Sequence, residues 1–146
     1  MVDKILVDTN ILLYAYDLGE PIKQPKAAAI LDHLVTRNAG VLTAQILAEF
    51  FVNGTRKLGK PLTANEAYDR IQNYLLAWDV LAVTGAIVLE AARGVRIYKM
   101  NYWDAQIWAA ARLNQIPTIL TEDFNVGATI EGVRFLNPFE EGFKME

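Results

Sequence analysis

Four acidic residues occupy positions where their carboxylates could carry out metal-dependent chemistry. Asp8 and Asp123 each follow a short apolar run that predicts a buried strand, and Asp104 falls inside the apolar arc of a predicted helix. Glu49 lies on another predicted helix, outside its apolar arc. Carboxylates in a chain with no cysteine and one histidine, His33, favour Mg²⁺ or Mn²⁺ over zinc. The four acids are therefore candidate ligands of a divalent metal.

Each acid taken alone also has a simpler interpretation. Asp8 fits a helix N-cap and Asp123 fits a turn, whereas Glu49 fits a solvent-exposed pair with Arg56. An unpaired carboxylate at Asp104 would cost several kcal/mol if it points inward. Either the helix N-terminus with a capping bond or a divalent cation could compensate it. The metal site has one advantage, because it explains why all four acids fall near one edge of one sheet.

The elements that must position these acids are short strands alternating with helices. Strands are expected at residues 4–7, 41–42, 79–83, 118–120 and 134–136, and helices at 11–16, 26–37, 43–58, 63–78, 84–98 and 101–114. This alternation predicts an α/β fold of three layers, α/β/α, with a mainly parallel central sheet. Ligands of such sheets bind beyond the carboxyl ends of the strands, which is where Asp8 and Asp123 are expected.

Composition excludes several other classes of protein. The 146 residues are 53% hydrophobic and 21% charged, which indicates one globular domain over residues 1–146. The absence of cysteine excludes a disulfide framework, a thiolate metal site and a cysteine nucleophile. We find neither a signal-peptide pattern nor an apolar run of the ~20 residues that a membrane span needs, and we expect a soluble cytoplasmic protein with no membrane partner. The net charge of −3 does not by itself indicate nucleic-acid binding, but carboxylates that recruit cations are compatible with a polyanionic substrate.

Four short motifs, taken in order, resemble the PIN domain family over nearly the whole chain. They are Val7-Asp8-Thr9-Asn10-Ile11-Leu12, Ala48-Glu49-Phe50, Trp103-Asp104-Ala105-Gln106-Ile107 and Leu120-Thr121-Glu122-Asp123. Within that family, the chain is most similar to VapC-type toxins of prokaryotic toxin–antitoxin pairs. That likeness rests on the chain length, on the stretch from Glu49 to Leu58 and on the ending from Glu131 to Phe139.

The resemblance implies a metal-dependent endoribonuclease that uses one or two Mg²⁺ or Mn²⁺ ions. These ions would activate water and stabilise the departing 3′ oxygen, leaving 5′-phosphate and 3′-hydroxyl ends. It also implies a homodimer and an antitoxin that holds the enzyme inactive. The residues matching the family's acidic quartet are Asp8, Glu49, Asp104 and Asp123, and those matching its supporting polar positions are Asn10 and Thr121.

Several assignments stay open at this point. Arg56, Arg93 and Arg96 are candidate RNA contacts, but they also fit solvated helix faces. Glu122 is a further candidate metal ligand, and we interpret His33 as structural. An RNA-processing PIN nuclease without a toxin role and a catalytically silent binding module are the alternative functions. A phosphatase of the haloacid dehalogenase type is set aside, because it needs a second aspartate where this chain has Asn10.

Overall fold

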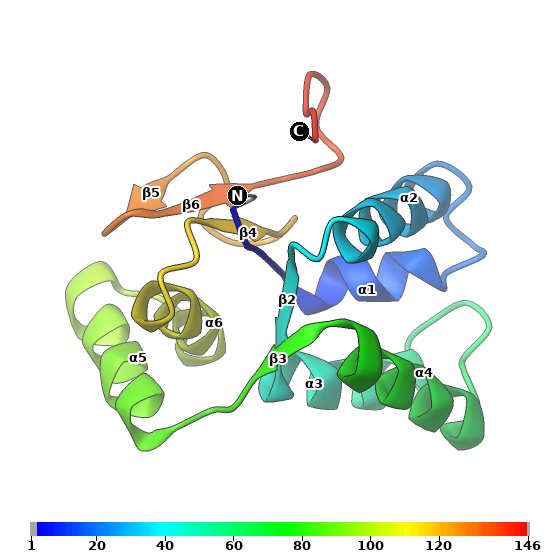
Figure 1. Ribbon diagram of the computed structural model, residues 1–146, viewed down its shortest axis with the longest axis horizontal. Helices are drawn as coiled ribbons and strands as arrows, with labels where there is room; N and C mark the ends of the chain where they lie inside the picture. Colours follow the sequence, from blue (N-terminus) through cyan, green and yellow to red (C-terminus); the bar gives the residue numbers. More distant parts are fainter. Residues whose placement is uncertain (1–2, 146) are drawn as a thin grey trace.

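The central feature of the fold is one six-stranded sheet, seen in the computed structural model, which describes residues 3–145 (Figure 1). The strands lie in the order β3-β2-β1-β4-β6-β5, and every neighbouring pair is parallel except β5 with β6. The predicted α/β architecture with a mainly parallel sheet is confirmed. The strands are β1 (Ile5–Val7), β2 (Gly40–Thr43), β3 (Asp79–Leu81), β4 (Thr118–Leu120), β5 (Thr129–Ile130) and β6 (Val133–Leu136).

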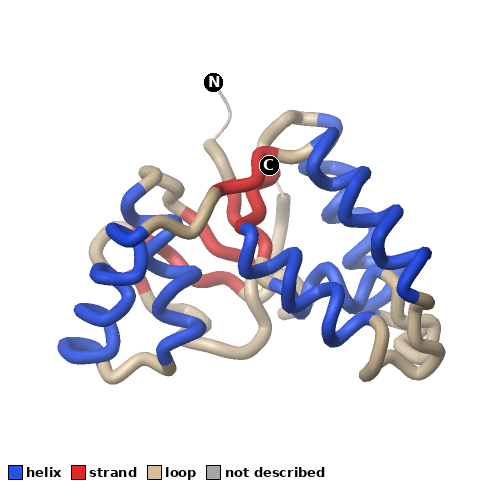
Figure 2. Tube along the Cα trace, turned by 90° about the horizontal axis from the view of Figure 1, so that it is seen from below, coloured by secondary structure: helices blue, strands red, loops and turns tan. Residues whose placement is uncertain are grey.

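Helices cover both faces of this sheet. The helices are α1 (Thr9–Ala15), α2 (Lys23–Thr36), α3 (Ala44–Gly54), α4 (Ala64–Ala77), α5 (Gly85–Tyr98) and α6 (Tyr102–Leu113). Figures 1 and 2 show α5 and α6 together on one side of the strands, with α1 to α4 on the other. No helix among residues 3–145 is both long enough and apolar enough to span a membrane.

Side-chain caps explain where most of these helices begin. The hydroxyls of Thr43 and Thr84 accept hydrogen bonds from backbone N–H groups three residues later, in the first turns of α3 and α5. At the start of α4, Thr63 and Glu66 form the reciprocal capping box that their spacing predicts. Asn101 caps α6 by accepting from the backbone N–H of Trp103 at 3.0 Å.

Two predicted helix boundaries are wrong. Helix α2 begins at Lys23 rather than near residue 26, because Pro25 falls in its first turn, where a missing N–H costs no helical hydrogen bond. Helix α3 ends at Gly54 rather than at Leu58. The residues that follow turn sharply, and Leu62 N–H donates to the carbonyl of Gly54 at 2.9 Å. The apolar side chain of Leu58 is buried in this turn rather than on a helix face.

The predicted last strand is confirmed as β6, but the sequence analysis missed β5, with which it forms a hairpin. Its turn is Glu131-Gly132, and both residues have positive φ, 49° and 84°. Such a two-residue turn suits the twist of a hairpin, but it is strained for a glutamate because of its Cβ. The buried indole of Trp108 on α6 donates to the carbonyl of Ile130 at 3.1 Å and ties the hairpin to the helical layer.

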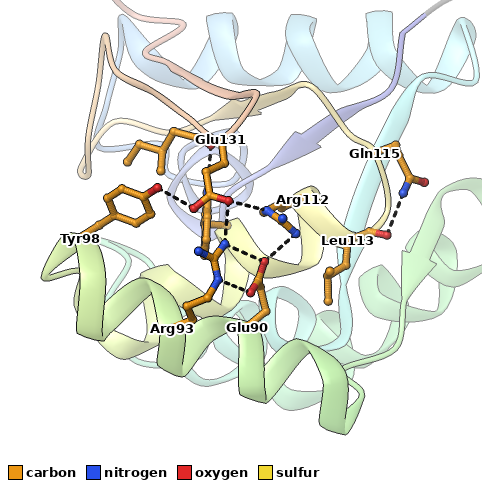
Figure 3. A network of polar contacts seen from close by, with 9 residues as sticks. Glu90, Arg93, Tyr98, Arg112, Leu113, Gln115 and Glu131 are labelled. Carbon is orange, nitrogen blue, oxygen red and sulfur yellow. Dashed lines mark hydrogen bonds and ion pairs between the residues drawn. The ribbon is translucent and has the colours of Figure 1, made fainter.

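An ionic network holds the strained Glu131 in place (Figure 3). Its carboxylate accepts from Arg93 of α5 at 2.7 Å and from Arg112 of α6 at 3.0 Å, and Tyr98 donates to its second oxygen. Glu90 completes the network by pairing with both arginines. The hydrogen bond from Arg93, followed by that from Tyr98, lowers the pKa of Glu131 to about 2. Charge therefore fixes the hairpin against α5 and α6.

Glu131→Gln is expected to lower the free energy of unfolding at pH 7 by about 1 kcal/mol, since these partly exposed pairs are screened by solvent. A lowered folded-state pKa contributes stability above the unfolded pKa, so the difference from wild type should vanish as pH falls from about 4.5 to about 2. Urea unfolding across this range measures it, with Glu140→Gln on the exposed C-terminal segment as the matched control. Equal stability of the variant and the wild type at pH 7 would contradict the role of the network.

Candidate metal centre

Asp8 is the buried acid at the middle of the candidate site. It follows β1 directly. The two strands that pair with β1, β2 and β4, run parallel to it, so the carboxyl ends of all three strands lie at the same edge of the sheet. Its side chain is 6% exposed. One carboxylate oxygen accepts from the backbone N–H of Thr9 at 2.7 Å, and the other accepts from the hydroxyl of Thr121 at 2.8 Å. Asp8 is therefore both the N-cap of α1 and an acid aimed along the carboxyl edge of the sheet.

Glu49 faces the same centre from α3. The hydroxyl of Thr9, the residue that follows Asp8, donates to Oε1 of Glu49 at 2.8 Å. A single hydrogen bond therefore links Glu49 to the segment that carries Asp8. Glu49 is half-buried, whereas Arg56 is exposed, and no ion pair joins the two among residues 3–145. The interpretation of Glu49 as one half of a solvent-exposed pair is therefore wrong.

Asp104 reaches the centre from the opposite helical layer. It stands in the first turn of α6 and is half-buried. Asn101 caps this helix through Trp103, and among the described residues the carboxylate of Asp104 makes no hydrogen bond. The capping bond considered in the sequence analysis is therefore absent. Burial, then the charges of Glu49 and Asp123, raise the pKa of Asp104.

Asp123, Asn10 and Thr121 form the outer side of the centre. Asp123 is exposed on the turn after β4, and the amide of Asn10 donates to its Oδ2 at 2.8 Å. The hydroxyl of Thr121 accepts from the backbone N–H of Asp123 at 3.2 Å while it donates to Asp8. Thr121 is fully buried, and it thus couples the turn after β4 to the acid after β1.

The four acids share an excess of negative charge that nothing in the described part of the chain neutralises. No salt bridge within residues 3–145 includes Asp8, Glu49, Asp104 or Asp123. Burial raises the pKa of Asp8 to about 7, against the lowering effect of its two hydrogen bonds and with a further upward contribution from the charges of Asp104 and Glu49. The charges of Asp104 and Glu49 thus add to the cost of ionising Asp8, and a cation at the centre would lower that cost.

A divalent cation fits this centre by donor chemistry. The donors are carboxylate oxygens, as hard cations prefer. Among residues 3–145, Oδ1 of Asn10 is the one buried side-chain polar atom without a hydrogen-bond partner. The acids are nevertheless arranged as an open cluster, since no group of three acidic or histidine side chains in that range is close enough to hold a metal ion. Binding of a cation therefore requires the side chains to draw together.

Glu122 is engaged outside this cluster. Lys23 of α2 forms an ion pair with one of its oxygens, and Tyr14 of α1 donates to the other. Burial opposes ionisation of Glu122, but the hydrogen bonds from Lys23 and Tyr14 leave its pKa below its usual value. Lys23 also lies over the ring of Tyr14, 4.8 Å from its centroid. These contacts occupy the carboxylate that the sequence analysis considered as an additional metal ligand.

The candidate RNA contacts lie in different environments. Arg56 is exposed in the turn after α3, and Arg96 is exposed on α5. Arg93 instead pairs with Glu90 and Glu131, so its charge is balanced within the protein. Arg56 and Arg96 are thus the two of the three arginines whose charge faces solvent.

Sequence reasoning passed over Thr9 in the site, and Tyr14 and Lys23 beside it. Thr9 stands between the candidate residues Asp8 and Asn10, and that position is the sequence signal that could have found it. Tyr14 and Lys23 carry no such signal, because they meet Glu122 across separations of 108 and 99 residues. Such pairs become visible only once α1 and α2 are packed.

The fold and the site together define an α/β protein with an acid-lined centre at the carboxyl edge of its sheet. The model of the PIN domain family matches residues 5–129, and the chain belongs to that family. A search of the curated proteins finds no significant match.

Solved structures similar to this chain include several toxin–antitoxin proteins. A toxin–antitoxin complex from Klebsiella pneumoniae is 20% identical with a TM-score of 0.67, covering 94% of this chain and 99% of that one. VapC20 of Mycobacterium tuberculosis, described as a sarcin–ricin loop cleaving toxin, is 19% identical with a TM-score of 0.67, covering 90% and 99%. VapBC2 of Rickettsia felis, solved with a promoter DNA fragment, is 17% identical with a TM-score of 0.64, covering 91% and 97%. At these identities, the likeness establishes a shared fold.

Proposed function

We propose that the protein is a metal-dependent endoribonuclease that uses Mg²⁺ or Mn²⁺, and that it acts as the toxin of a toxin–antitoxin pair. The observation that carries the proposal is a set of four carboxylates at the carboxyl edge of a PIN-family sheet, none of which pairs with a cationic side chain in the described part of the chain. A bound divalent cation would supply the positive charge that activates water and stabilises the departing oxygen of a phosphodiester.

The chain's own residues divide the remaining work. Asp8, Glu49, Asp104 and Asp123 would hold the cation. Thr121 orients Asp8 through its hydroxyl, and Asn10 orients Asp123 through its amide. Thr9 keeps Glu49 turned toward the same centre. Such supporting hydrogen bonds limit the rotation of acidic ligands and raise the fraction of time in which all of them face one point.

The toxin role rests on the relatives of the fold. The similar protein from K. pneumoniae was solved in a toxin–antitoxin complex, and VapC20 is described as a sarcin–ricin loop cleaving toxin. We extend the proposal to an RNA substrate, a cognate antitoxin and a homodimer. An RNA-processing nuclease without a toxin role would share the same centre. Expression separates the two, because a toxin arrests growth unless its antitoxin is present, whereas harmless overexpression argues for the processing role.

Cleavage of end-labelled structured RNAs by the purified protein tests the nuclease. Cleavage is expected with Mn²⁺ or Mg²⁺ and not with EDTA, and Asp8→Ala serves as the contamination control. Direct titration of Mn²⁺ accompanies the assay. Absence of both cleavage and Mn²⁺ binding would overturn the proposal in favour of a binding module.

Arg56→Ala is expected to weaken RNA binding severalfold while Mn²⁺ affinity stays unchanged. The slope of the logarithm of the binding constant against the logarithm of the salt concentration should become shallower by about one, the contribution of one phosphate contact. The reason is that Arg56 is exposed at the end of the helix that carries Glu49. Filter binding at several salt concentrations measures the effect. Arg134→Ala is the matched control. Arg134 is exposed on β6 and lies opposite Thr118 at the start of β4, so it is at the end of the sheet away from the acidic centre. Equal losses in both variants would leave Arg56 no specific role.

A further inference from the structure

A groove of about 480 Å³ lies beside the acidic centre, between the N-terminal parts of α3 and α6 and the loop after β3. Apolar walls come from Ala44, Ala48 and Val83, and the indole of Trp103 forms a further wall. Cavities of this size are typical of sites for small organic groups. Glu49 also lines the groove, so the groove is continuous with the acidic centre.

Trp103 is the aromatic residue that lines this groove. Its side chain is 58% exposed, whereas Trp108, five residues further along α6, is fully buried. Trp103 precedes Asp104 in the chain and lines the groove together with Glu49. Exposed aromatic rings beside nucleic-acid chemistry commonly serve as stacking platforms, because every base has a π-face.

The backbone and ring of Trp103 are nevertheless held in place. Tyr102 packs edge-on against the indole, with ring centroids 5.1 Å apart. Gln45 Nε2 donates to the carbonyl of Trp103 at 3.0 Å, and Gln106 Nε2 donates to Gln45 Oε1 at 2.8 Å. The hydroxyl of Tyr102 in turn donates to Gln106. This chain of polar contacts fixes the entrance of the groove and reduces the entropy lost when a planar ligand stacks there.

Gln45 adds hydrogen-bonding capacity to the groove. An amide offers two N–H donors and two acceptor lone pairs. The contacts to Trp103 and Gln106 use one donor and one lone pair of Gln45, which leaves one N–H donor and one acceptor lone pair of its amide. Side-chain amides pair with base edges in this way.

The geometry points to a subsite in which one unpaired RNA base, next to the phosphodiester at the acidic centre, stacks on Trp103 in the groove. The inference rests on the proposed nuclease function and names the form of its substrate. The RNA is single-stranded at the cleavage point, because a base inside a duplex cannot turn out onto the indole without unstacking. Trp103 thus contacts the substrate base directly, and it favours RNA in which that base is unpaired.

The test compares a short oligoadenylate with an abasic ribose-phosphate chain of equal length, in EDTA so that neither is cleaved. Wild type is expected to bind the oligoadenylate about tenfold more tightly, in line with ~1–3 kcal/mol per stacked base, and its tryptophan fluorescence should be quenched. Trp103→Ala should lose both the preference and the quenching. Trp103→Phe should retain part of the preference without the quenching, and Tyr68→Ala, which removes an exposed aromatic ring from α4, should behave as wild type.

An equal affinity of wild type for the two probes would overturn the subsite, as would an undiminished base preference in Trp103→Ala. A shift of Trp103→Ala to a smaller oligomer with unchanged base preference would also overturn it, since the indole would then face a second copy of the chain. Failure of the nuclease proposal is distinguishable, because it appears as base binding through Trp103 without cleavage of RNA by wild type in Mn²⁺.

Discussion

Asp104→Asn is expected to abolish Mn²⁺-dependent cleavage of RNA while leaving the fold intact. Asp104 brings a half-buried carboxylate from α6 to the acids that follow β1 and β4, and among the described residues that carboxylate makes no hydrogen bond. The amide keeps the shape of the side chain but removes its charge, and with it both the cost of burying that charge and the repulsion from Glu49 and Asp123, which together raise the pKa of Asp104. Without the metal, the transition state loses several kcal/mol of stabilisation, which corresponds to a decrease of at least about a thousandfold in the rate of cleavage.

Single-turnover cleavage measures this loss, and circular dichroism with thermal unfolding establishes that the variant is folded. Asp69→Asn is the matched control, because Asp69 is an exposed acid on α4. A titration of Mn²⁺ should show weakened binding by Asp104→Asn alone. Unchanged cleavage by the variant would remove Asp104 from the metal centre.

Asp8→Asn is expected to stabilise the metal-free protein at alkaline pH. Burial raises the pKa of Asp8 from 3.8 to about 7, so the folded state favours the neutral acid. The stability that the neutral form contributes is present below about pH 4 and is lost as pH rises through about 7. At about 1.4 kcal/mol for each pKa unit, the free energy of unfolding of the wild type falls by at most about 4 kcal/mol over this pH range. Asparagine cannot ionise, and it remains a good N-cap for α1.

Urea unfolding in EDTA should therefore show equal stabilities of the variant and wild type near pH 4, and a variant more stable by a few kcal/mol at pH 8. Saturating Mn²⁺ should stabilise wild type by about 2.7 kcal/mol at a hundred times its Kd and leave Asp8→Asn nearly unchanged. A difference between the proteins that is the same at pH 4 and pH 8 would show that ionisation of Asp8 is not its cause.

Local chemistry allowed much of this fold to be predicted from the sequence. The capping box at Thr63 and the strand of residues 118–120 both follow from short-range patterns, and both are confirmed. The hairpin strand β5 escaped notice because it has only two residues, although Glu131-Gly132 is a recognisable turn signal. The start of α2 was placed too late because Pro25 was interpreted as part of a loop.

The candidate site shows where such prediction stops. Positions after strands indicate that Asp8 and Asp123 lie at one sheet edge, but the direction of a side chain depends on contacts between distant segments. The hydrogen bond from Thr9 to Glu49 spans 40 residues, and the pairing of Lys23 with Glu122 spans 99. Only packing decides that Glu49 turns inward and that Glu122 turns away.

The shortness of the two outer strands has a consequence for the behaviour of the protein at high concentration. An outer strand exposes unpaired backbone N–H and C=O groups, on which other chains can assemble into aggregates. Here β5 has two residues and β3 has three, and β3 begins with the exposed acid Asp79. The hydrophobic strands β1, β2 and β4 lie inside the sheet, between these short edges. The order of the strands thus protects the chain against growth of intermolecular β-structure.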